Sequence, residues 1–189
     1  MNNKIKQMVY AGLLTALAII IPIQFGFLKI IIPPFTATLA AHVPMMLAML
    51  ISPVVAIVVG IGSTIGFLIS GMPAPVVARA ATHIVVGYIG ARIIMKNQSY
   101  VKAAVITAPI HGLLEMLVVI PFIGVNVYQL LIVTAVGSML HHCVDSAIAY
   151  AIVKAVAKAR NKNIYNVFGD FKTQQALWLL ENTKKYKRQ

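Results

Sequence analysis

Residues 73–92 read PAPVVARAATHIVVGYIGAR. The stretch is apolar and long enough to cross a bilayer, because a membrane-spanning helix needs about 20 mostly apolar residues. It nevertheless carries Arg79 and, one helical turn later, His83. A guanidinium stays charged at any ordinary pH, so its burial in hydrocarbon is costly unless it meets an anion or water. The rest of the chain must therefore supply a partner for Arg79.

The composition is that of an integral membrane protein. The 189 residues are 60% hydrophobic and only 11% charged, with a mean hydropathy of +0.87. The formal net charge is +12, but the basic residues lie between and after the apolar runs, so we expect no nucleic-acid binding. The single Cys143 excludes a disulfide framework and a paired-thiol metal site, and its place in an apolar run favours packing.

The apolar runs predict an all-α integral membrane fold, a bundle of six transmembrane helices. Proline, glycine and polar residues separate the runs. The expected spans are residues 9–23, 35–50, 53–70, 75–95, 103–120 and 127–153. The second span is short, which suits a partly re-entrant geometry as well as a full crossing. The first is interpreted as a retained span, because no convincing cleavage site follows it.

The distribution of lysine and arginine predicts that both termini are cytoplasmic. This orientation leaves only Lys29 outside, and it places the basic residues from Lys154 onward inside. We expect two parts: a membrane domain over residues 1–158 and a basic cytoplasmic tail over residues 159–189. The aromatic and basic tail is typical of an interfacial helix on anionic lipid, and a disordered tail is the alternative.

Most of the titratable side chains that are not surface lysines fall inside the expected spans. Such groups are costly in a membrane and usually mark a functional site. At a rise of 1.5 Å per residue, five of them share one layer in the outer half, namely Arg79, His83, His111, Glu115 and His42. By the same measure His141, His142 and Asp145 lie deeper, toward the cytoplasm.

The spacing of these residues predicts a pocket. Arg79 with His83, and His111 with Glu115, are each four residues apart and so share one helix face. If the two faces meet, they form a polar pocket open to the outside, in which Arg79 binds a carboxylate or phosphate. The alternative is an Arg79–Glu115 ion pair that only locks two helices together. We favour the ligand site.

Three further features leave alternatives open. His141 and Asp145 share a face, whereas the adjacent His142 points about 100° away, so we favour a packing network and assign no metal site. His42 precedes Pro44 and either bonds a freed backbone group or contacts a ligand. Phe27, in an apolar outer loop, either covers the pocket or anchors the loop at the membrane surface.

The sequence contains no phosphate-loop motif and no hydrolase motif, so we do not expect an enzyme.

The chain resembles a known family. Its six short spans, its apolar first outer loop and the small-residue pattern AGLLTA at residues 11–16 are similar to the S components of energy-coupling-factor (ECF) vitamin transporters. Residues 35–53, FTATLAAHVPMMLAMLISP, followed by RAATH at 79–83, resemble the niacin-specific branch of that family. The general resemblance covers nearly all of residues 5–158.

The resemblance implies a plasma-membrane subunit that captures a vitamin, here niacin, from outside and releases it inside. The implied partners are a membrane scaffold subunit and two cytoplasmic ATPases, which use ATP, while this chain carries no cofactor. The scaffold would dock on the small face of the first helix, formed by Ala11, Gly12, Thr15 and Ala16.

The resemblance also implies roles in a niacin site. Arg79 would bind the carboxylate, His83 or another polar group the pyridine nitrogen, and Phe27 would stack on the ring. The remaining expected site residues are His42, His111, Glu115 and His141.

Three other functions stay open at this point. The first is an S component for another small vitamin or precursor, of the pyrimidine or pyridoxine type. The second is a stand-alone metal-ion transporter that uses His83, His111, Glu115 and His141. The third is an assembly protein whose polar contacts are only structural.

Overall fold

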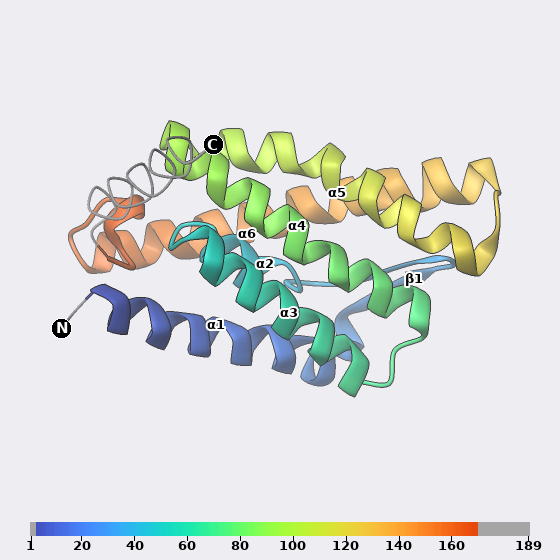
Figure 1. Cartoon of the computed structure of the whole chain (residues 1–189), viewed down its shortest axis with the longest axis horizontal. Coiled ribbons are helices and arrows are strands. Elements are labelled where there is room, and N and C mark those ends of the chain that lie inside the picture. Colours follow the sequence, from blue (N-terminus) through green and yellow to red (C-terminus); the bar gives the residue numbers. More distant parts are fainter. Residues whose placement is uncertain (1–2, 170–189) are drawn as a thin grey trace, which may run out of the picture.

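The computed structural model describes the chain from residue 3 to residue 169. Five long helices run side by side along the molecule (Figure 1). They are α1 (Asn3–Gln24), α3 (Pro53–Ile69), α4 (Ala74–Asn97), α5 (Tyr100–Ile123) and α6 (Gly137–Ala159). A π-helical segment, η2 (Tyr128–Val136), leads into α6 without a break. Four helical stretches are long and apolar enough to cross a membrane, and α3 is a shorter apolar helix, which confirms a mostly helical membrane protein.

The expected second span is corrected by the structure. Residues 35–50 do not form one crossing helix but a strand, a turn and the six-residue helix α2 (Val43–Ala48). Strand β1 (Lys29–Ile32) pairs antiparallel with β2 (Phe35–Thr38), in the register that places Lys29 opposite Thr38. Pro44 explains the late start of the helix, because a proline has no N–H to donate and its ring clashes with the carbonyl four residues earlier. Every residue of α2 is buried.

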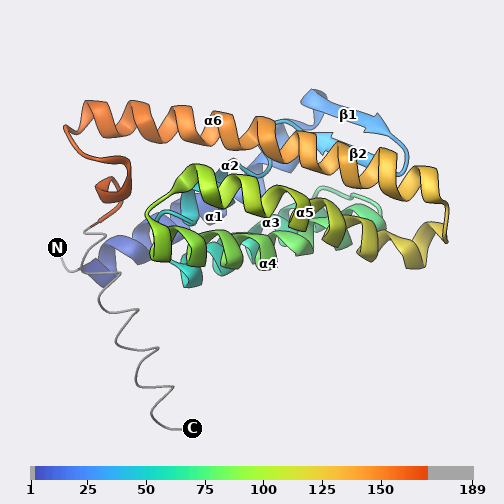
Figure 2. The same ribbon diagram turned by 90° about the horizontal axis from the view of Figure 1, so that it is seen from above.

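The segment from β2 to α2 replaces the expected second span along the path of the chain. Figure 1 shows β2, the turn and α2 carrying the chain from the hairpin end of the bundle toward the opposite end, where α3 begins. The first residues of α1 and the last described residues after α6 lie at one and the same end (Figures 1 and 2). The two ends of the described part of the chain, residues 3 and 169, therefore lie at the same end of the bundle.

The expected cytoplasmic tail is described only in part. After α6 the chain forms the short 3-10 turn η3 (Ile164–Asn166) and folds back on the bundle. Val167 is buried, and the Phe168 ring meets the edge of the Tyr10 ring of α1 with centroids 5.1 Å apart. The interfacial helix that we expected from Asp170 onward lies outside the described residues.

Glycines on α3 set its close approach to two neighbouring helices. A Cβ placed on Gly60 would lie 2.8 Å from the Cα atom of Ile84 on α4. A Cβ on Gly66 would lie 2.7 Å from the Cα atom of Ile19 on α1. Backbone atoms cannot rotate away as a flexible side chain can, so these two crossings require glycine.

Replacing Gly66 with alanine is therefore expected to push α1 and α3 apart and to destabilise the bundle by about 1–3 kcal/mol, the usual cost of overpacking. Thermal unfolding of the purified protein in detergent measures the effect. Gly12→Ala on α1 is the matched control, because nothing lies within 4 Å of a Cβ at Gly12. Equal stability of the Gly66→Ala and Gly12→Ala proteins would show that the crossing is not tight.

Candidate functional site

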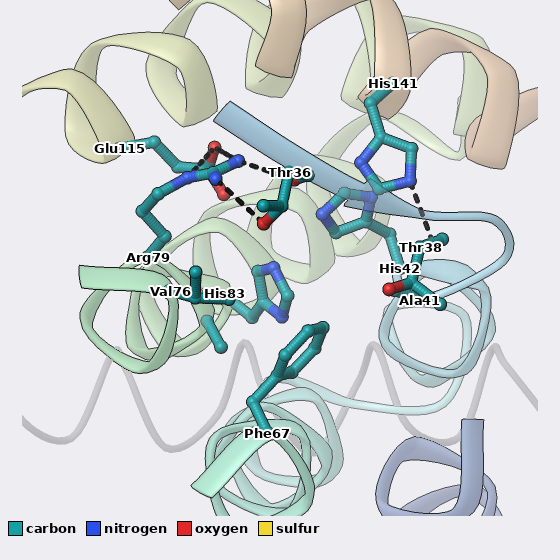
Figure 3. Close-up of a pocket in the computed structure, with 11 residues that line it drawn as sticks. Thr36, Thr38, Ala41, His42, Phe67, Val76, Arg79, His83, Glu115 and His141 are labelled. Carbon is teal, nitrogen blue, oxygen red and sulfur yellow. Dashed lines mark hydrogen bonds and ion pairs between the residues drawn. The ribbon is translucent and has the colours of Figure 1, made fainter. Parts of the chain in front are cut away.

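The partner that Arg79 requires is Glu115. Helix α4 positions Arg79 and helix α5 positions Glu115, and both side chains are 4% exposed. The guanidinium donates from Nε and Nη2 to Oε2 of the carboxylate, at 3.0 and 2.8 Å. The ion pair that the sequence offered as an alternative to a ligand site thus exists (Figure 3). It uses only part of the guanidinium, which has five N–H donors.

The remaining donors of Arg79 hold the β1–β2 hairpin. Nη2 also donates to the carbonyl oxygen of Thr36 at 3.0 Å, and Nη1 reaches the Thr36 hydroxyl at 3.3 Å. The ring of Phe35 lies against the guanidinium, with the Arg79 Cζ atom 5.0 Å from its centroid. The hairpin therefore covers the buried cation. Sequence reasoning missed Thr36 and Phe35, because both were expected in a helix.

Glu115 divides its two oxygens between two sets of partners. Oε2 accepts from Arg79 and also from the hydroxyl of Ser138 on α6. Oε1 lies 3.2 Å from Nε2 of His111, one turn earlier on α5. The carboxylate therefore links α4, α5 and α6. A lone serine such as Ser138 gave no signal in the sequence.

Three imidazole rings meet beside this carboxylate. His42 and His83 have centroids 4.6 Å apart, His42 and His111 4.7 Å, and His83 and His111 5.3 Å, all in edge-on arrangements. Each ring is 2% exposed or less. The Nδ1 atom of His83 bonds the Ser63 hydroxyl of α3 at 2.9 Å. The layer predicted from the sequence, Arg79 and Glu115 with these three histidines, is thus assembled by the fold.

Asp145 of α6 holds the turn that precedes α2. Its Oδ1 accepts the backbone N–H of Ala40 and its Oδ2 accepts that of His42, both at 2.9 Å. His141 lies beside it, with Nε2 3.2 Å from Oδ2 and 3.1 Å from the carbonyl oxygen of Thr38. Because both of these oxygens are acceptors, we infer that Nε2 of His141 carries a proton. The packing network predicted for His141 and Asp145 is present, and it fixes the hairpin as well.

The separate, deeper layer expected for His141, His142 and Asp145 is wrong. The ring of His141 lies 4.3 Å from that of His42, centroid to centroid, and His142 contacts His111. The depth estimate assumed that all spans begin at one level. Figure 1 instead shows that the loop between α5 and η2 extends well beyond the start of α4. Residues at different distances from the ends of their own helices can therefore lie at the same depth.

His142 points away from His141, as expected for adjacent helical residues. Its Nε2 bonds the Thr107 hydroxyl at 3.0 Å, and its Nδ1 bonds Nδ1 of His111 at 3.1 Å. Thr107 donates its only hydroxyl proton to the carbonyl oxygen of Ala103, at 2.7 Å, so Nε2 of His142 must be the donor to Thr107. Nδ1 of a neutral His142 is then an acceptor, and His111 donates to it from Nδ1.

The cavity at this site is small. It holds about 20 Å³, room for about one water molecule. It is lined by Thr36, Thr38, Ala41, His42, Phe67, Val76, Arg79, Ala80, His83, Glu115 and His141 (Figure 3). Phe27, expected as the stacking residue, is 78% exposed and is not among the lining residues. Phe67 of α3 supplies an aromatic ring instead, and nothing in the sequence distinguished it from an ordinary apolar residue.

The four small residues expected to dock a partner divide into two pairs. Ala11 packs against the core, and the Thr15 methyl group lies 2.5 Å from where a Cβ on Gly62 would be, so both serve contacts within the bundle. Gly12 and Ala16 are exposed. They form the open part of the small-residue face on α1.

Apolar helices thus surround a small, charged cavity beneath the β1–β2 hairpin. The chain belongs to the family described as ECF-type riboflavin transporter, S component, which it matches over residues 2–168. It is also 35% identical over 179 residues to the niacin transporter NiaX of Lactococcus lactis subsp. cremoris (strain MG1363), covering 86% of this chain and 80% of that protein. No solved structure matches the chain.

Family membership settles the class of function. The chain is an S component of an ECF-type vitamin transporter and a multi-pass membrane protein, and both the family and the relative are transporters. The family implies a vitamin as substrate and an ECF module as partner.

Proposed function

We propose that this chain captures niacin, as nicotinate, from outside the plasma membrane and delivers it inside with an energising module. The likeness to a niacin transporter supports the choice of vitamin. The observation that carries the proposal is the buried Arg79, whose guanidinium contacts Glu115 and still has donors directed at the hairpin. Nicotinate is an anion at neutral pH and suits such a site. Riboflavin, which the family description names, is a larger and uncharged molecule that needs no buried cation.

In the proposed complex Arg79 holds two anions at once, Glu115 and the ligand carboxylate. Glu115 occupies Nε and one side of Nη2, while Thr36 occupies Nη1 and the other side of Nη2. A ligand carboxylate can replace Thr36 and accept two parallel N–H bonds, the geometry that guanidinium favours. Glu115 then stays in place and keeps the guanidinium oriented. A polar lining group other than His83, such as His141, contacts the pyridine nitrogen, and Phe67 packs beside the ring.

Binding requires the hairpin to move. The present cavity has room for about one water, so a pyridine ring cannot enter while Thr36 bonds Arg79. The outer strand β1 contributes little to the core, since Ile30, Ile31 and Ile32 are all more than half exposed. We propose that the ligand carboxylate competes for Arg79, releases Thr36 and lets the hairpin lift and close again over the vitamin.

Binding competition tests this function. Purified protein in nanodiscs is equilibrated with labelled nicotinate, and unlabelled nicotinate, nicotinamide, riboflavin or pyridoxine is added in excess. We expect only nicotinate to displace the label fully, because nicotinamide lacks the carboxylate and the other two lack an anionic group. Full displacement by riboflavin, or absence of any nicotinate binding, would contradict the proposal.

We further propose that the module, a membrane scaffold with two ATPases, docks on α1 at Gly12 and Ala16, and that both termini are cytoplasmic. Close helix contact needs small residues at the crossing. Gly12→Leu is expected to abolish co-purification with the module and vitamin uptake, while the isolated subunit still binds nicotinate. Ala151→Leu on α6, another exposed small residue, is the matched control. Unchanged uptake in the Gly12→Leu protein would exclude docking at this face.

A further inference from the structure

We propose that His42, His83, His111 and Glu115 form a four-ligand site for a divalent transition-metal ion of the zinc type. One side-chain donor atom from each of the four lies within 4.8 Å of the others, and all four side chains are buried. They come from three parts of the chain: the turn before α2, helix α4, and two adjacent turns of helix α5. The proposal concerns the ion alone and does not depend on which vitamin the protein binds.

The spacing of the rings fits a shared ion. Zinc binds imidazole nitrogen at about 2.0–2.1 Å, so three rings at tetrahedral angles around one ion have centroids about 5 Å apart. The observed separations are 4.6, 4.7 and 5.3 Å, with interplanar angles of 76°, 89° and 75°. Small side-chain rotations bring the donors onto one point.

Two of the three rings have a hydrogen-bond partner on the nitrogen that points away from the cluster, the arrangement that orients metal-binding histidines. Nδ1 of His83 bonds the Ser63 hydroxyl, and Nδ1 of His111 bonds His142. Nδ1 of His42 lies 2.9 Å from the Asp145 carboxylate, at an angle outside hydrogen-bond geometry. Because Nδ1 is engaged in His83 and His111, Nε2 is the atom that these two rings have left to bind an ion.

The contact between His111 and Glu115 gives the strongest argument for a metal ion between their side chains. The bonds of Thr107 and His142 place the proton of a neutral His111 on Nδ1, so its Nε2 presents a lone pair. That lone pair lies 3.2 Å from Oε1 of Glu115, and Nε2 has no hydrogen-bond partner although it is buried. Two facing acceptors repel each other, whereas a metal ion between them accepts from both.

The buried charges do not decide the matter. With neutral imidazoles, the buried groups are one cation, Arg79, and two anions, Glu115 and Asp145, all 3% exposed or less. A divalent ion changes their net charge from −1 to +1, so the net charge favours neither state and the donor set carries the assignment. The donor set of three nitrogens and one carboxylate oxygen favours zinc-like ions over magnesium or calcium, which take oxygen ligands.

The second group of possible ligands, His42 with His141 and Asp145, is a weaker candidate. Both oxygens of Asp145 already accept backbone N–H groups, and Nε2 of His141 faces a carbonyl oxygen. We therefore assign this group the supporting role of holding His42 in place.

Metal analysis of the whole protein tests the site. The chain is purified with a tag that contains no histidine, without chelators, and its metal content is measured by mass spectrometry. A chelator-treated sample is then titrated with Co²⁺, whose visible spectrum reports tetrahedral coordination. We expect about one ion per chain and a tetrahedral Co²⁺ spectrum. Absence of bound metal together with absence of that spectrum would overturn the proposal.

Variants separate the site from adventitious binding. His83→Gln and His111→Gln each remove a ligand and are expected to lose the ion, whereas Cys143→Ser, which removes the exposed thiol, is expected to keep it. Ser63→Ala leaves all four ligands and is expected to weaken Co²⁺ binding by about 10-fold, the usual effect of losing an outer partner. The Ser63→Ala variant also tests the metal site if a histidine variant fails to fold. Unchanged metal content in a folded His83→Gln protein, or unchanged affinity in Ser63→Ala, would contradict the assignment.

Discussion

Replacing Arg79 with glutamine is expected to lower the affinity for nicotinate by about 30-fold to 5,000-fold, because removing one partner of a buried charged pair costs about 2–5 kcal/mol. The affinity for nicotinamide should change little, since nicotinamide has no carboxylate for Arg79 to bind. Equilibrium binding of both compounds to the wild-type and variant proteins measures the difference. The loss should appear in the ratio of the two affinities, which a general loss of folded protein does not change.

A second variant separates the loss of nicotinate binding from a loss of folded protein. Arg79→Gln alone leaves the Glu115 carboxylate buried without its cation, which destabilises the protein in its own right. The double variant Arg79→Gln/Glu115→Gln removes both charges and keeps two hydrogen-bonding side chains. We expect it to be folded and still unable to bind nicotinate tightly. Tight nicotinate binding by either protein would remove Arg79 from its proposed role.

Replacing Asp145 with alanine is expected to destabilise the protein by about 2–6 kcal/mol. The carboxylate accepts two buried backbone N–H groups, those of Ala40 and His42, and each donor left unsatisfied costs about 1–3 kcal/mol. The turn before α2 and the attached hairpin should loosen with it. Thermal unfolding in detergent measures the loss of stability, and proteolysis measures exposure of the hairpin.

Asp145→Asn is the matched variant for this position. The amide has the same shape and keeps one acceptor oxygen, so it should recover part of the stability that alanine loses. Equal unfolding temperatures for the wild-type and Asp145→Ala proteins would show that the carboxylate does not hold the turn.

Much of the fold could be predicted from the sequence, because five of the apolar runs are long helices with proline, glycine or serine at their ends. The hairpin could not be found by apolar content alone. Residues 30–35 and 43–50 are apolar throughout, and a window long enough to detect a span merges β2 with α2. The available signal was local: two short β-branched stretches flank Pro33 and Pro34, and a further proline, Pro44, begins α2.

The sequence predicted those parts of the site in which two residues lie one turn apart on the same helix. Four-residue spacing correctly placed Arg79 with His83 and His111 with Glu115, and the two faces meet in the structure. Contacts between elements could not be predicted in this way. Ser63 and Phe67 come from α3, and Thr36 comes from the hairpin, so their proximity depends on how far each element extends beyond its neighbours.

Native mass spectrometry of the gently purified protein tests the central claim, that Arg79 anchors an anionic vitamin beneath the hairpin. The wild-type protein should carry a bound species with the mass of nicotinic acid, about one per chain after nicotinate is supplied. The Arg79→Gln/Glu115→Gln protein, prepared in the same way, should carry none. A wild-type protein that instead retains riboflavin or another uncharged vitamin, or a double variant that retains nicotinic acid as well as the wild type does, would contradict the account.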